Sequence, residues 1–150
     1  MRKSLLVVAV CAVLGLMISP LAFGDSHILK IGFNIPLTGD NPDVGASSKN
    51  GAEMYLKKNP SIEVGGKKYE LKVNYEDNEY KAESADKANT KLITDEGVLA
   101  IVGPQSSSQA VPAGEIANNL ATPMISPWST NPNTTLDLSL IHISEPTRLC

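Results

Sequence analysis

The stretch that decides the fold runs from Val102 to Thr135 and reads VGPQSSSQAVPAGEIANNLATPMISPWSTNPNTT. An apolar strand over 99–102 ends at Gly103-Pro104, and three serines lead into a helix predicted over 110–119. Pro112 is expected in the first turn of that helix, where proline is tolerated because its missing N–H would have no partner. A second short strand, over 124–126, ends in another polar loop.

The serines stand where the predicted helix begins. Free backbone N–H groups and the positive end of the helix dipole make such a place a seat for a small anion, for example a carboxylate. Loops that follow neighbouring parallel strands form the crevice in which open α/β sheets bind ligands. Residues 103–108, which we call the serine loop, and the loop around Ser129 and Thr130 therefore predict half of a binding site for a small zwitterion.

Strands and helices alternate along the rest of the chain. Strands are predicted over 29–34, 69–75, 99–102 and 124–126, and helices over 46–59, 81–94 and 110–119, with a loop over 40–45 before the first helix. This order predicts the α/β class, with a parallel, doubly wound sheet and right-handed crossovers. Because polar and apolar residues alternate over 69–75, that strand is expected near an edge. The expected core-facing helix residues are Ala52, Met54, Tyr55, Leu56, Ala82, Ala85, Ala88, Leu92, Ile93, Val111, Ala113, Ile116, Ala117 and Leu120.

The two polar loops, together with IGFNIPLTGDNPDVGASSKNGAEM over 31–54, resemble the branched-chain amino acid binding proteins of ABC transporters. Those are type I periplasmic binding proteins, and the likeness covers residues 29–135, the start of such a protein. The resemblance implies the N-terminal lobe of a two-lobe, non-enzymatic receptor. Such a receptor binds an amino acid between its lobes in the periplasm and delivers it to the membrane permease. A sensory domain on the same fold and an exported α/β enzyme remain as alternatives.

The resemblance also implies roles for individual residues. Ser107 stands at the serine that binds the ligand's carboxylate, Thr130 at the hydroxyl that completes the site, and Trp128 at a main-chain carbonyl that accepts from the ammonium. The purely structural alternatives are that Ser107 caps its helix, that the Thr130 hydroxyl stabilises a turn, and that Trp128 packs against its neighbours. Val44 stands where an aromatic often occurs, which leaves open another amino acid, a short amide or an aromatic acid as ligand. The complete expected set is Ser106, Ser107, Trp128, Ser129, Thr130 and Val44.

The N-terminus has the pattern of an export signal. Arg2 and Lys3 precede an apolar run over 5–18, and small residues before position 25 predict cleavage after Gly24. The run is too short for a typical transmembrane span, so no membrane span is expected after cleavage. Cys11 raises a lipid anchor as an alternative, which Val10 disfavours because a lipobox wants a small residue there. The domain organisation is therefore a signal peptide over 1–24 and a partial lobe over 25–137.

The C-terminal residues 138–150 are expected to be non-native. LSLIHISEPTR, over 138–148, resembles the translation of a transposase-type sequencing adapter. The alternative is an ordinary amphipathic tail. On the adapter interpretation His142 and Cys150 carry no functional argument, and residues 25–137 contain no cysteine for a disulfide.

Composition and motifs disfavour other functions. The net charge of −3 without a basic stripe argues against nucleic acid. The sequence lacks a G-x-S-x-G elbow, a G-x-G-x-x-G fingerprint and metal-binding histidine pairs, so no catalytic residue, cofactor or metal is expected. The acidic residues Glu76, Asp77 and Glu79 suggest a cation site less strongly than a solvated cap at a strand end or a helix N-terminal signal.

Overall fold

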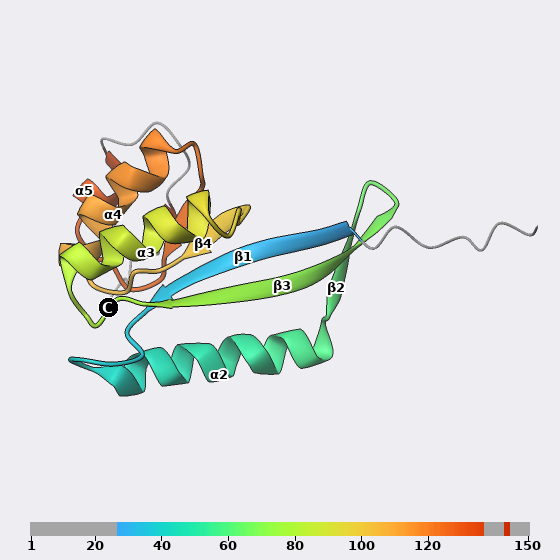
Figure 1. Ribbon diagram of the computed structural model, residues 1–150, viewed down its shortest axis with the longest axis horizontal. Coiled ribbons are helices and arrows are strands. Elements are labelled where there is room, and N and C mark those ends of the chain that lie inside the picture. The colour runs from blue at the N-terminus through green and yellow to red at the C-terminus, as the bar shows by residue number, and fades with distance from the viewer. Residues whose placement is uncertain (1–26, 137–142, 145–150) are drawn as a thin grey trace, which may run out of the picture.

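The computed structural model describes residues 27–136 and 143–144, and its strands and helices alternate along the chain (Figure 1). The predicted signal peptide over 1–24 lies outside the described residues. The elements are β1 (His27–Ile35), α2 (Pro42–Lys58), β2 (Ser61–Val64), β3 (Lys67–Asp77), α3 (Ala82–Thr94), β4 (Ala100–Val102), α4 (Ser107–Asn119), β5 (Met124–Ser126), α5 (Asn133–Leu136) and β6 (Ile143–Ser144).

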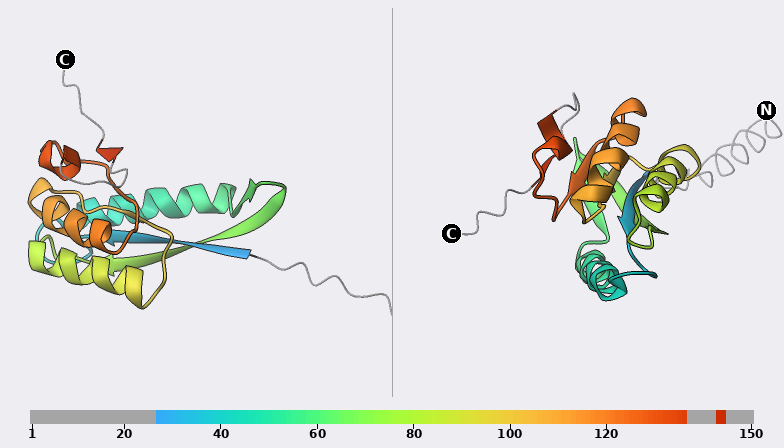
Figure 2. Two further views of the ribbon diagram at one scale, coloured as in Figure 1. Left: turned by 90° about the horizontal axis from the view of Figure 1, so that it is seen from above. Right: turned by 90° about the vertical axis from the view of Figure 1, so that its left-hand side faces the viewer.

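The predicted parallel α/β sheet is confirmed, with strand order β2-β3-β1-β4-β5-β6. β1 pairs in parallel with β3 on one side and with β4 on the other, and of the pairings between described strands only the hairpin β2–β3 is antiparallel. Figures 1 and 2 show α2 on one face of the sheet and α3 and α4 on the other. Since the chain changes direction of winding at β1, a crevice is expected beyond the carboxyl ends of β1 and β4.

The core lies between the sheet and the face of α3 and α4. Leu92, Ile101 and Met124 are fully buried there together with alanines of both helices. A glycine at position 32 lets α3 approach β1 closely, because a Cβ there would lie 3.0 Å from the Leu92 side chain. The prediction that Ala82 and Leu120 belong to this core is wrong, because Ala82 is exposed and Leu120 is 40% exposed.

Among the described elements, α2 alone covers the opposite face of the sheet (Figure 2). Between that helix and the sheet lies an apolar cavity of about 280 Å³, which we call the α2 groove. Met54 and Tyr55, predicted to pack inward, are 62% and 59% exposed. The groove is lined by Ile31, Phe33, Ala52, Tyr55, Leu56, Leu71, Val73 and Val102.

Two helix starts differ from those predicted by three residues or more, and one strand was not predicted. α2 begins at Pro42, so the loop expected over 40–45 is wrong; proline at the start of a helix is pre-organised for it. α4 begins at Ser107, which places Pro112 inside the helix instead of in its first turn. A strand was missed over 61–64: Gly65 and Gly66, both at positive φ, close a hairpin that makes β2 the sheet edge and puts β3 next to it.

β6 pairs in parallel with β5, although it falls within the stretch predicted to be non-native. The adapter interpretation of 138–150 therefore remains a prediction. Among the helices of the described residues, none is long and apolar enough to cross a bilayer.

Candidate functional site

The site centres on the hydroxyl of Ser107, the first residue of α4. Its Oγ lies 3.1 Å from the hydroxyl oxygen of Ser129, which donates to it. The backbone N–H groups of Thr130 and Asn131 also donate to it, at 3.2 and 3.4 Å. The segments after β4 and β5 thus meet at one serine oxygen, which accepts from the loop after β5 instead of capping its own helix.

The loop after β5 is held in place by hydrogen bonds of buried hydroxyl groups. Ser129 is 1% exposed and shares a short hydrogen bond with Thr134 of α5. Ser126, at the end of β5, donates to the carbonyl of Pro104 in the serine loop. Thr130 is exposed on this base, and Trp128 is 58% exposed. Buried hydroxyls therefore fix the loop while its exposed residues face solvent.

Ser106 occupies the N-cap position of α4 with extended backbone geometry, yet its side chain makes no capping hydrogen bond. Its hydroxyl lies 2.9 Å from that of Ser108 instead. Of the residues predicted for the site, the structure thus brings Ser107, Ser129 and Thr130 into contact, and leaves Ser106 directed along the serine loop.

Val44 lies on the first turns of α2, half-buried, and is joined to the serine loop by two residues that sequence reasoning missed. Gln105 donates from Nε2 to the hydroxyl of Ser48 at 2.7 Å, and Ser48 donates to the carbonyl of Val44 at 2.9 Å. Gln105 is 2% exposed. Neither residue belongs to a recognisable motif; the only sequence signal is a glutamine between two turn residues and a serine run.

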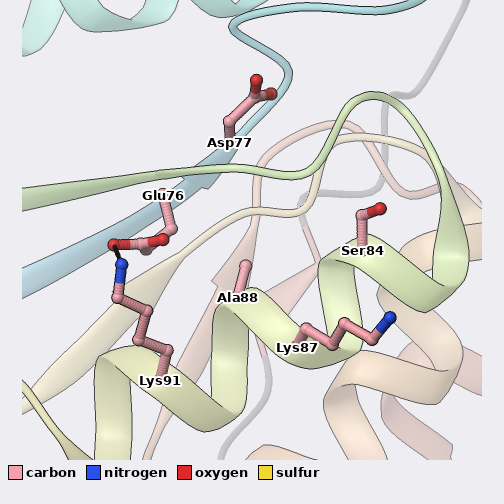
Figure 3. A pocket seen from close by; sticks show the side chains of 6 residues that line it. All are labelled: Glu76, Asp77, Ser84, Lys87, Ala88 and Lys91. Carbon is pink, nitrogen blue, oxygen red and sulfur yellow. Dashed lines mark ion pairs between the residues drawn. The ribbon is translucent and has the colours of Figure 1, made fainter.

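The acidic residues at the end of β3 and just after it are all engaged by protein groups. Glu76 pairs with Lys91 at 2.7 Å and Glu79 with Lys81 at 2.9 Å. Glu76, Lys91 and Asp77 stand beside a pocket of about 190 Å³ (Figure 3). In this view Asp77 is directed toward the loop after β1, away from the Glu76–Lys91 pair. No group of three or more potential ligands able to hold a metal ion occurs among the described residues.

Asp77, interpreted from the sequence as part of a solvated cap or a helix N-terminal signal, accepts hydrogen bonds from the loop after β1 and the turn after β3. Burial opposes its ionisation, but hydrogen bonds from the Thr38 hydroxyl and from the backbone N–H groups of Glu79, Leu37 and Thr38 outweigh that effect. They hold the pKa of the Asp77 carboxyl below its usual value. Asp77 is therefore an ionised acceptor that organises backbone donors.

The chemistry available at Ser107 is recognition by neutral donors. Hydroxyls, exposed backbone N–H groups and the positive end of α4, a helix of 13 residues, all favour a negatively charged group. A serine nucleophile needs a base within hydrogen-bonding reach. The histidine of the described residues, His27, begins β1 and therefore lies at the other end of the strands from the serine loop.

Comparison with known proteins establishes the class. The sequence model of the periplasmic binding protein family matches residues 28–144, so the chain belongs to this family, whose members bind solutes and are not enzymes. The chain is 31% identical over 135 residues to an "Amino acid binding protein" of Pseudomonas aeruginosa, covering 89% of this chain and 34% of that protein.

Solved structures agree with the fold. A leucine binding protein, LivK, of Thermotoga maritima matches with a TM-score of 0.67 and 28% identity over 73% of this chain and 30% of that one. LivJ of Streptococcus pneumoniae, solved with isoleucine, matches with a TM-score of 0.62 and 29% identity over 71% of this chain and 30% of that one. The chain spans about a third of the length of the relatives it matches.

Proposed function

We propose that this chain is part of the solute-binding component of an ABC importer, and that the site at Ser107 binds the carboxylate of an amino acid or a related small zwitterion or amide. After export, the protein would work in the periplasm, close over its ligand with a second lobe and deliver it to the permease subunits.

The observation that carries this proposal is the convergence of two loops on the Ser107 hydroxyl. The backbone N–H groups of Thr130 and Asn131 now donate to a serine oxygen, and a carboxylate oxygen is a stronger acceptor for the same donors. The relatives' own descriptions, leucine binding in one and an isoleucine complex in another, support an amino acid over other anions.

The side-chain pocket is proposed to differ from that of leucine binders. Val44, half-buried on α2, is smaller than an aromatic, and the buried carboxamide of Gln105 lies one hydrogen bond from the same helix. A site of this composition admits a larger or more polar side chain than leucine. The ligand class proposed is therefore amino acids and small amides, with branched-chain amino acids as the reference.

The experiment is calorimetric titration of the full-length protein, with both lobes, with a panel of amino acids and short amides. The proposal expects one ligand bound per chain, with a Kd in the micromolar range or below, and recovered unchanged. Absence of binding across the panel, or chemical conversion of the bound compound, would contradict it.

A further inference from the structure

Asp77, the last residue of β3, collects four donors from two separate loops. Its Oδ1 accepts the backbone N–H groups of Leu37 at 2.8 Å, Thr38 at 3.2 Å and Glu79 at 2.9 Å, while its Oδ2 accepts the Thr38 hydroxyl. One half-buried carboxylate thus holds the loop after β1 and the turn after β3 together.

The turn after β3 needs such support. Glu79 and Tyr80 have φ values of 51° and 61°, the left-handed region that non-glycine residues rarely adopt and that persists only where surrounding contacts enforce it. Asp77 accepts from the N–H of Glu79, and the Asn78 side chain accepts from the N–H of Tyr80 at 2.9 Å. The loop after β1 packs on this turn, because a Cβ on Gly39 would lie 2.4 Å from the carbonyl oxygen of Glu79.

The other side of the same loop presses against α2. A Cβ on Gly45 would lie 1.7 Å from the carbonyl oxygen of Pro36, so the loop and the first turn of α2 are in direct backbone contact. From there the hydrogen bonds of Ser48 to Val44 and of Gln105 to Ser48 lead into the serine loop. Each link is a contact between packed groups, and Gln105 stands two residues before Ser107.

We propose that Asp77 is a positioning residue of the ligand site: it fixes the loop after β1, and through α2 and Gln105 it sets where the Ser107 hydroxyl meets the loop after β5. Asp77 itself touches no ligand. The consequence for affinity rests on the proposed function, whereas the consequence for the geometry at Ser107 does not.

The test compares four forms of the complete protein, labelled with ¹⁵N in leucine, serine and threonine: wild type, Asp77→Ala, Asp77→Asn and Val98→Ala. Val98 is 7% exposed in the core before β4, at the opposite end of the strands, so its truncation destabilises the fold without touching the loops. Asp77→Asn retains one acceptor oxygen and serves as the conservative rescue.

In Asp77→Ala the amides of Leu37 and Thr38 are expected to exchange with solvent at least tenfold faster. The amide resonances of Ser107 and Thr130 are expected to shift well beyond their shifts in Val98→Ala, and the asparagine variant is expected to lie between alanine and wild type. Should Asp77→Ala fail to fold, Asp77→Asn and Thr38→Val carry the same comparison. Ser107 and Thr130 resonances that move no more than in Val98→Ala would overturn the proposal and leave Asp77 as an anchor of its own loop.

Calorimetry with L-leucine on the same samples separates the two claims. Weaker leucine binding in Asp77→Ala, by tenfold or more relative to Val98→Ala, supports the positioning role. Binding weakened equally in both variants contradicts it. Wild type that binds no leucine counts against leucine as ligand, while the resonance shifts still decide the role of Asp77.

Discussion

Replacing Ser107 with alanine separates the contribution of its hydroxyl to the fold from its contribution to the ligand. The fold loses little: Ser129 keeps its bond to Thr134, and the exposed N–H groups of Thr130 and Asn131 turn to water. One net hydrogen bond is worth about 1 kcal/mol, which in a domain of about 150–250 residues lowers the Tm by roughly 2–4 °C.

The ligand loses more than the fold does. A hydrogen bond to a charged carboxylate contributes about 1.5–3 kcal/mol, so Ser107→Ala is expected to weaken amino acid binding about 10- to 100-fold. Calorimetry on the complete protein measures the affinity, and thermal unfolding without ligand measures the stability. Ser108→Ala is the matched control, because Ser108 is an exposed neighbour whose hydroxyl contacts Ser106 alone among the described groups. Binding by Ser107→Ala within threefold of wild type would refute the assignment.

Three further predictions concern the stability of the fold and the compounds that its exposed surface binds. Asp86→Asn is expected to stabilise the protein at pH 7 by about 0.5 kcal/mol, because burial, with Glu115 and Glu83 nearby, raises the pKa of the Asp86 carboxyl. The ionised form therefore costs stability above that pKa, and the gain should vanish near pH 3 in thermal scans, since both states are then protonated. Asn34→Ala is expected to cost about 4 kcal/mol in urea unfolding, because three buried hydrogen bonds to Ala85, Asn89 and Asn78 lose a partner. Residues 25–137 alone are expected to bind the dye ANS at the apolar α2 groove and to bind no panel amino acid at micromolar concentration.

Each of these has a control. Asn50→Ala, at an exposed position of α2, should leave the urea midpoint unchanged or slightly raised, and an Asn34→Ala variant equally stable would contradict the buried network. An Asp86→Asn gain that is the same at pH 3 and pH 7 would exclude the electrostatic explanation. For the fragment, the complete protein should bind little ANS, and micromolar amino acid binding by 25–137 would reject the prediction.

The sequence predicted the alternation of strands and helices and the parallel sheet because each buried element carries a clear apolar period. β5 was predicted with the bounds that the structure has, and α3 began one residue from its expected start. The missed strand 61–64 has an exposed face and pairs only along one edge, so its pattern SIEV carries no burial signal. The predicted loop over 40–45 missed the early start of α2 at Pro42, where Gly45 allows close contact with the backbone of Pro36.

The site was predictable only in part, for a physical reason. The loops that carry Ser107 and Thr130 could be brought together because strand ends are encoded locally and loops after neighbouring parallel strands meet at one edge. The roles of the two residues came from the resemblance and stay predictions. The supporting bonds of Gln105 and Asp77 join segments 57 and 40 residues apart in the chain, and no local pattern encodes such pairs. The side chains of Gln105 and Asp77 reach their hydrogen-bond partners only because the sheet order brings β3, β1 and β4 side by side.

The most direct measurement of the central claim is a comparison of the tightest-binding amino acid of the panel with its carboxamide, titrated into the complete protein. If the N–H donors beside Ser107 receive the carboxylate, neutralising that group should weaken binding by tenfold or more, and Ser107→Ala should reduce the difference between the two compounds. Equal affinities for the acid and its amide, unchanged by the serine substitution, would show that the negative charge is bound elsewhere.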